Sequence, residues 1–166
     1  MKAGPGDADA SDLLEEFDRL RDAYPRQMSA SLVLPLLQVV QQQKGHVTPA
    51  DARFVADYAG VPPMQVIEAL SWYTMLHRQP VGRHVVKVCR NIACALRGSD
   101  RLLTHVEKKL GVAPGGTTAD GRVTFLAVEC LASCGTAPAL QINNGAYHET
   151  LDVPRALALI ERLASE

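Results

Sequence analysis

VECLASCGTAP, residues 128–138, contains two of the four cysteines in this chain of 166 residues. The other two lie in VCRNIACALRG, residues 88–98, so the full pattern is C-x4-C, a gap of 35 residues, and C-x3-C. A short β-branched run precedes each pair, HVVKV before Cys89 and VTFLAVE before Cys130, and such runs predict strands. Two loops at the same end of one sheet would bring the four thiols into a single site.

The rest of the C-terminal half predicts a small α/β domain around these strands, over residues 81–166. A helix is expected from Ser99, a capping residue, to Gly111, which ends it. Asn143-Asn144-Gly145 separates ALQI from AYHE and predicts a hairpin. A final helix is expected after Asp152. The order strand, helix, strand, strand, strand, helix indicates one mixed sheet.

Residues 11–80 have helical periodicity and predict a bundle of helices. The first helix begins at Ser11 or Asp12, and the others cover about Ser31–Lys44, a segment capped by Thr48 and closed by Gly60, and about Met64–Met75. ASLVLPLLQVV and VIEALSWYTML are apolar over more than one stripe, so each is expected to be covered on several sides. A shared core is the preferred explanation, and docking onto another subunit is the alternative, because a bundle of about 65 residues is marginal alone.

Composition excludes several classes of protein. Apolar residues make up 47% of the chain and charged residues 21%, which is typical of a folded domain. The net charge of -1 supplies no field for nucleic acid or an anionic membrane, so neither is an expected partner. Residues 1–10 are mostly Gly, Ala, Asp and Pro and are expected to form a mobile tail.

The cellular compartment bears on the cysteine chemistry, and the sequence indicates the cytoplasm. No apolar run is long enough to span a membrane, and MKAGPGDADASD lacks the apolar core of a signal peptide. Direct membrane insertion is therefore not expected. In a reducing compartment, paired cysteines more often bind metal or perform redox chemistry than form disulfides.

Four kinds of chemistry compete for the four thiols. Disulfides are disfavoured by the compartment, and a thioredoxin-type dithiol requires C-x-x-C, which neither pair has. Structural zinc is the serious alternative, because four cysteines satisfy tetrahedral Zn²⁺ and such spacings are permitted. A [2Fe–2S] cluster is wider than a single ion and suits the looser spacings. We favour the cluster, since small residues beside both pairs let backbone N–H groups approach sulfur, and zinc stays open.

Four stretches, in chain order, carry a resemblance to a known family: SWYTMLHRQPVGRH, VCRNIACALRG, HVEKKLGVAPGGTTADGRVTF and VECLASCGTAPALQIN. They resemble the thioredoxin-like [2Fe–2S] subunit of the NADH-dehydrogenase module of respiratory complex I, the E subunit of NADH:quinone oxidoreductase. The resemblance extends from about Ser31 to the C-terminus, and nothing is carried over to the N-terminal 25 residues. Subunits of NAD-linked hydrogenases and formate dehydrogenases are similar, so the parent complex stays open.

The resemblance implies an α+β fold, with a helical bundle over residues 11–80 followed by a thioredoxin-like α/β domain with a mixed sheet over residues 81–166. It implies one [2Fe–2S] cluster, whose ligands would be Cys89, Cys94, Cys130 and Cys134. It also implies a neighbouring subunit that binds NADH and FMN, with the cluster exchanging electrons with the flavin as a side reservoir. The complex would lie at the membrane periphery.

Other residues have less specific roles. The sequence contains no G-x-G-x-x-G, Walker loop or Ser/His/Asp constellation, so no catalysis is expected of the isolated chain. Trp72 stands where Phe is commoner in the family, and Trp72 and Tyr73 are expected to be core or domain-interface residues rather than an electron relay. Pro138 occupies a position that resembles the cis-proline of thioredoxin folds, and we expect it to be cis. His84 and His148 are expected on strands, not as ligands.

Overall fold

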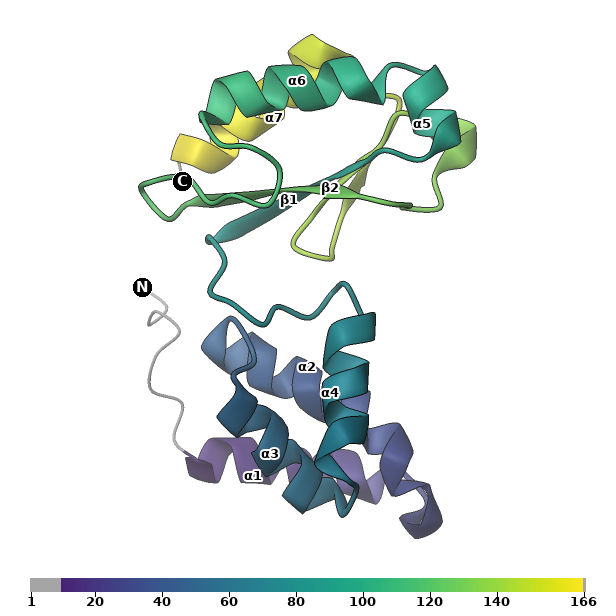
Figure 1. Cartoon of the computed structure of the whole chain (residues 1–166), viewed down its shortest axis with the longest axis vertical. Helices are drawn as coiled ribbons and strands as arrows, with labels where there is room; N and C mark the ends of the chain where they lie inside the picture. Colours follow the sequence, from purple (N-terminus) through teal and green to yellow (C-terminus); the bar gives the residue numbers. More distant parts are fainter. Residues whose placement is uncertain (1–9, 166) are drawn as a thin grey trace. The chain divides into compact units, whose positions relative to one another are not determined.

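The computed structural model describes residues 10–165 of the chain. The chain divides into two compact units, with the division between Pro80 and Val81. Over the described residues, the first unit is helical and the second combines a sheet with helices (Figure 1). The expected α+β fold, with helices first and a mixed sheet after them, is confirmed. The tail expected at residues 1–10 lies outside the described residues, apart from Ala10, which begins the first helix.

The described part of the N-terminal unit contains all four expected α-helices and a 3₁₀ helix that was not expected. Its elements are α1 (Ala10–Asp22), the 3₁₀ helix η1 (Arg26–Leu32), α2 (Val33–Lys44), α3 (Pro49–Ala59) and α4 (Pro63–Trp72). A capping box begins α3, because the Thr48 side chain accepts from the Asp51 N–H and the Asp51 carboxylate accepts from the Thr48 N–H. Gly60 ends the same helix, as expected, and its φ of 69° places it in the left-handed conformation.

The fourth helix ends three residues earlier than expected, at Trp72 rather than Met75. Tyr73 directly follows the helix and has an extended backbone, with φ -83° and ψ 103°, so the helix stops there. The following backbone is bound to α2 by one side chain, since Gln41 Nε2 donates to Met75 O at 2.8 Å and Gln41 Oε1 accepts from His77 N at 2.5 Å. These two hydrogen bonds replace those that a longer helix would form.

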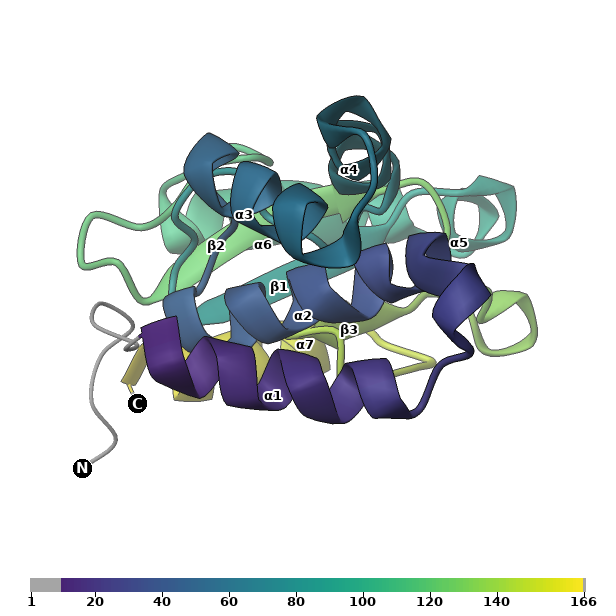
Figure 2. The ribbon, with the colours of Figure 1, turned by 90° about the horizontal axis from the view of Figure 1, so that it is seen from below.

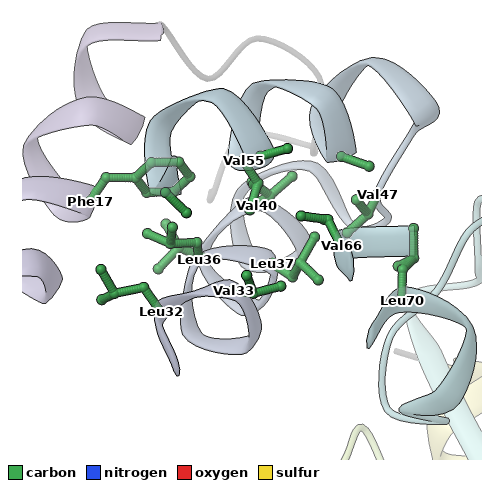
Figure 3. Close-up of a cluster of buried hydrophobic side chains, with 14 of the residues drawn as sticks. Phe17, Leu32, Val33, Leu36, Leu37, Val40, Val47, Val55, Val66 and Leu70 are labelled. Carbon is green, nitrogen blue, oxygen red and sulfur yellow. The ribbon is translucent and has the colours of Figure 1, made fainter. Parts of the chain in front are cut away.

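Helix α2 lies at the centre of the core of this unit, as its sequence predicted. Five of its twelve residues are buried: Val33, Leu36, Leu37, Val39 and Val40. Figure 3 shows Phe17 of α1, Val55 of α3 and Val66 of α4 directed into the same cluster. The Phe17 ring also meets the Tyr58 ring edge-on, with centroids 5.0 Å apart. The bundle therefore has a continuous apolar core of its own.

Helix α4 is covered less fully than its sequence predicted. Only Val66 and Leu70 are buried on it, whereas Met64, Ile67 and Trp72 are exposed. Trp72 is 82% exposed, so it does not pack in the core, and the alternative that it is a domain-interface residue stays a prediction. The apolar surface of α4 is wider than the core of this unit covers, so these side chains are exposed.

The C-terminal unit is built on a four-stranded sheet of order β2-β1-β3-β4. The strands are β1 (His84–Cys89), β2 (Val123–Val128), β3 (Leu140–Ile142) and β4 (Tyr147–His148). The β1 and β2 strands are parallel, and β3 is antiparallel to both β1 and β4. His84 and His148 lie on strands, as expected. The two long helices are α6 (Ser99–Leu110) and α7 (Val153–Ser165), and the short elements α5 (Ile92–Leu96) and η2 (Cys134–Thr136) were not foreseen.

Helices α6 and α7 cover one face of this sheet (Figure 1). The core between them is formed by alternate strand residues and helix residues, including Val86, Val88, Phe125, Leu102, Val106 and Ile160. Since side chains alternate along a strand, Val85, Lys87 and Cys89 belong to the opposite face of β1. Among the described residues, no helix has the length and hydropathy needed to cross a membrane.

Candidate metal centre

The two cysteine loops begin at the same edge of the sheet because β1 and β2 are parallel and in register. Cys89, the last residue of β1, is the register partner of Val128, the last residue of β2. Two backbone hydrogen bonds continue the pairing beyond the strands, from Arg90 N to Val128 O at 3.0 Å and from Cys89 N to Ala139 O at 3.1 Å. This backbone pairing confirms the expectation that both cysteine loops leave the same end of one sheet.

The first loop turns at once into the short helix α5, which turns the second cysteine inward. Asn91 caps this helix, and its Oδ1 accepts from Ile92 N at 2.9 Å. Cys94 then lies on the buried side, whereas Ile92 and Leu96 are exposed. Gly98, with φ of 94°, separates α5 from α6 in a conformation that other residues adopt only with strain. The C-x4-C spacing thus corresponds to one capped helical turn.

The second loop reverses direction around its two cysteines. Ala132 has a positive φ of 59°, and its N–H donates to Cys130 Sγ at 3.3 Å. Cys134 begins η2, after which Ala137 and Pro138 lead into β3. The Ala137–Pro138 bond is cis, as the resemblance implied. The α5 helix and the η2 turn lie side by side in both Figure 1 and Figure 2.

The second loop is also held from its outer side. Thr136 Oγ1 donates to Glu149 Oε1 at 2.6 Å, and Thr136 O accepts from Thr150 N at 2.7 Å. The hydrogen bonds from Thr136 and Ser133 lower the pKa of the Glu149 carboxyl. This segment of chain after β4 therefore fixes the loop that carries Cys130 and Cys134.

An ion pair connects the two loops beside the sheet edge. Arg90 directly follows the first cysteine, Glu129 directly precedes the third, and Arg90 Nε and Nη2 both donate to Glu129 Oε1, the Nε bond being 3.0 Å long. Both side chains are largely exposed. The pair connects the two loops. Because its two charges cancel, it adds no net charge to the site.

Three of the four thiols share one neighbourhood. Cys89 and Cys94 are buried and pack with Leu131 and Ala137 in an apolar cluster. Burial raises the pKa of the Cys94 thiol, the adjacent Cys89 thiol and the charge of Cys134 raise it further, and a backbone hydrogen bond with Ala139 opposes them. Ionised thiolates in such surroundings require a nearby cation, and a bound metal supplies one.

Cys130 is placed differently from the other three. It is exposed, as is Cys134, and its sulfur accepts a hydrogen bond from its own loop through Ala132. In the described part of the chain, no group of three or more His, Cys, Asp or Glu side chains forms a ready-made site for a single metal ion. The two loops that carry the predicted ligands thus leave one edge of the sheet, with two of the four thiols buried and two exposed.

Sequence reasoning missed several residues around the site. The Arg90–Glu129 pair was not anticipated, although one charged residue abuts a cysteine in each motif. Lys87 was assigned no role, yet it is 4% exposed and burial lowers its pKa. Its position within an apolar strand, two residues before Cys89, is the signal that would have singled it out.

Comparison with known proteins bears on this arrangement. Residues 17–164 match the family described as thioredoxin-like [2Fe–2S] ferredoxin. The NADH-quinone oxidoreductase E 2 subunit of Rhizobium meliloti is 40% identical over 147 residues, which cover 89% of this chain and 86% of the relative. NADH-quinone oxidoreductase subunit 2 of Thermus thermophilus is 35% identical over 156 residues, covering 93% of this chain and 84% of the relative.

A solved structure supports the fold. The crystal structure of NAD⁺-reducing [NiFe]-hydrogenase in the air-oxidized state contains a chain that aligns with a TM-score of 0.70 and 24% identity. The alignment covers 86% of this chain but 24% of that chain. At this identity the likeness concerns the fold alone.

Proposed function

This chain belongs to the thioredoxin-like [2Fe–2S] ferredoxin family, and from that premise we propose that it is an electron-transfer subunit of an NADH-oxidising complex. Its counterpart is the E subunit of NADH:quinone oxidoreductase. One [2Fe–2S] cluster is bound in this proposal by Cys89, Cys94, Cys130 and Cys134. The observation that carries the proposal is the register of β1 with β2, from which both cysteine loops leave the same edge of the sheet.

The donors present suit this cofactor. Four thiolates are the usual ligands of a [2Fe–2S] cluster, which when bound accepts and returns one electron. Hydrogen bonds directed at sulfur stabilise such a centre, and the chain offers Ala132 N–H to Cys130 and the Ala139 backbone to Cys94. Leu131 and Ala137 cover the buried pair of thiols and limit the access of water. The four cysteines would hold the cofactor, the backbone groups of Ala132 and Ala139 would orient it, and Leu131 and Ala137 would shield it from water.

We assign the hydride chemistry to a neighbouring subunit. In the proposal this partner binds NADH and FMN, and its flavin exchanges electrons with the cluster, which serves as a side reservoir. Relatives that are named as subunits of NADH-quinone oxidoreductase support assembly into a larger oxidoreductase. The isolated chain would then have no catalytic activity, and the complex would be cytoplasmic and peripheral to the membrane. An equivalent subunit of an NAD-linked hydrogenase or formate dehydrogenase is the alternative parentage.

Anaerobic purification of the full chain tests the proposal. A [2Fe–2S] protein should be brown, contain two irons per chain, and lose its visible absorption on addition of dithionite. A zinc-stabilised assembly module is the competing function, because four cysteines also satisfy Zn²⁺. A colourless protein with one zinc per chain and no iron would establish that alternative and refute the electron-transfer role.

A further inference from the structure

Lys87 is a buried cation in the strand that leads to the candidate centre. It is 4% exposed and precedes Cys89 by two residues on β1. Its Nζ donates to Asn144 Oδ1 in the turn between β3 and β4, a neutral acceptor. Its register partners on the flanking strands are Leu126 and Gln141, both uncharged. Within the described residues, no carboxylate forms an ion pair with it.

A buried ammonium without an anion is costly, and lysines are rarely buried unless they are paired. The anion expected on this side of the sheet is the thiolate-bound centre at Cys89. Residues two apart on a strand share a face and have Cα atoms about 6.6 Å apart. The Lys87 side chain reaches toward Asn144, which lies near the start of β1 and away from Cys89, so its charge acts on the centre at a distance along the same face of the sheet rather than by contact.

We propose that Lys87 is an electrostatic positioning residue that raises the reduction potential of the cluster, an inference that rests on the proposed function. Reduction adds one electron and hence one negative charge at the centre, and a fixed positive charge stabilises the reduced form more than the oxidised form. Lys87 binds neither iron nor sulfur in this role. No proton and no further reactant enters the step.

Two substitutions separate the charge of Lys87 from its bulk. Lys87→Met keeps the length and removes the charge, whereas Lys87→Arg keeps the charge. The full chain, purified anaerobically, is titrated potentiometrically with the reduced cluster followed by electron paramagnetic resonance. At a fixed potential we expect Lys87→Met to lower the ratio of reduced to oxidised cluster about tenfold, which is about 59 mV for one electron. Unit charges about 10 Å apart at an effective dielectric constant of about 20 suffice for that change.

Control variants make the result decisive. Lys87→Arg should stay within about twofold of the wild type in the same ratio, and Lys108→Met, which removes an exposed charge from α6, should do the same. If Lys87→Met does not retain iron, Lys87→Gln is titrated in its place. An unchanged or raised potential in the uncharged variant overturns the inference, and so does an equal fall in Lys87→Arg. A wild-type chain without iron refutes the proposed function instead.

Discussion

Arg90 and Glu129 form an ion pair between the residue after the first cysteine and the residue before the third. Because the two strands that carry them are parallel and in register, the pair ties together two loops that are far apart in sequence. Each partner is also the direct neighbour of a proposed ligand.

We expect this ion pair to contribute little to global stability. The Arg90 and Glu129 side chains are 55% and 78% exposed, and pairs of this kind contribute about 0–1 kcal/mol. Glu129→Gln should therefore lower the free energy of unfolding in urea by less than about 1 kcal/mol. A double-mutant cycle with Arg90→Gln measures the coupling directly. A coupling energy above about 2 kcal/mol would show that the pair behaves as a buried one.

The ligand assignment predicts a loss of the cluster in single cysteine variants. Cys94→Ala removes a buried thiol and Cys130→Ala an exposed one, yet both should abolish visible absorption, because each takes one of four ligands. Thr104→Ala, on the exposed side of α6 and without a thiol, should retain the colour. Iron content and absorbance of the anaerobically purified chains are the measurements. Full iron stoichiometry in either cysteine variant would refute the four-cysteine assignment.

Asp51 should make the stability of the helical unit sensitive to acid. Burial alone would raise its pKa, but hydrogen bonds from Lys44 and Thr48 outweigh burial and lower it below the ordinary value of 3.8. A carboxylate with a lowered folded-state pKa stabilises the fold above its unfolded pKa, and this contribution is lost as the pH falls through the folded pKa. Asp51→Asn should therefore cost about 1–2 kcal/mol at pH 7 and progressively less below about pH 4.

Urea unfolding of the wild type and Asp51→Asn at pH 7, 5 and 3 checks this dependence. The difference between the two proteins should be the same at pH 7 and 5 and smaller at pH 3. Asp57→Asn is the matched control, because Asp57 is exposed on the same helix and forms no ion pair with any described residue. A difference that grows as the pH falls would contradict the sign of the pKa shift.

The two faces of the bundle should respond very differently to truncation. Leu37 is fully buried on α2, so Leu37→Ala should cost about 2–5 kcal/mol. Trp72 is 82% exposed, so Trp72→Ala should change the free energy of unfolding by no more than about 0.5 kcal/mol. Urea denaturation of the isolated chain gives both values. A large loss of stability in Trp72→Ala would mean that this side chain packs within the chain after all.

Local signals were sufficient for much of the fold. Thr48 and Gly60 bound α3 because a cap and a left-handed residue are decided by their own backbone. The strands β1 and β2 followed from β-branched runs, although β2 ends at Val128, just before the expected end at Cys130. The end of α4 could not be predicted from local sequence. The backbone that follows it is bound by Gln41, which lies more than thirty residues away in the sequence.

The candidate site shows the same division. Sequence alone predicted the four cysteines as ligands and the edge of the sheet from which both of their loops leave, because thiol spacing and strand ends are local properties. It did not predict the Arg90–Glu129 pair, the burial of Lys87 or the exposure of Trp72. Each of these depends on which segments become neighbours once the chain has folded.

The amino-acid sequence by itself determined which residues are the candidate ligands, the order of the strands and the longer helices, and most of the caps and turns that bound them. Only the tertiary structure decided which charges lie against those residues and which apolar side chains are covered. The physical reason is that backbone preference acts over a few neighbouring residues, whereas burial and electrostatic interaction act through space between strands paired across long stretches of chain.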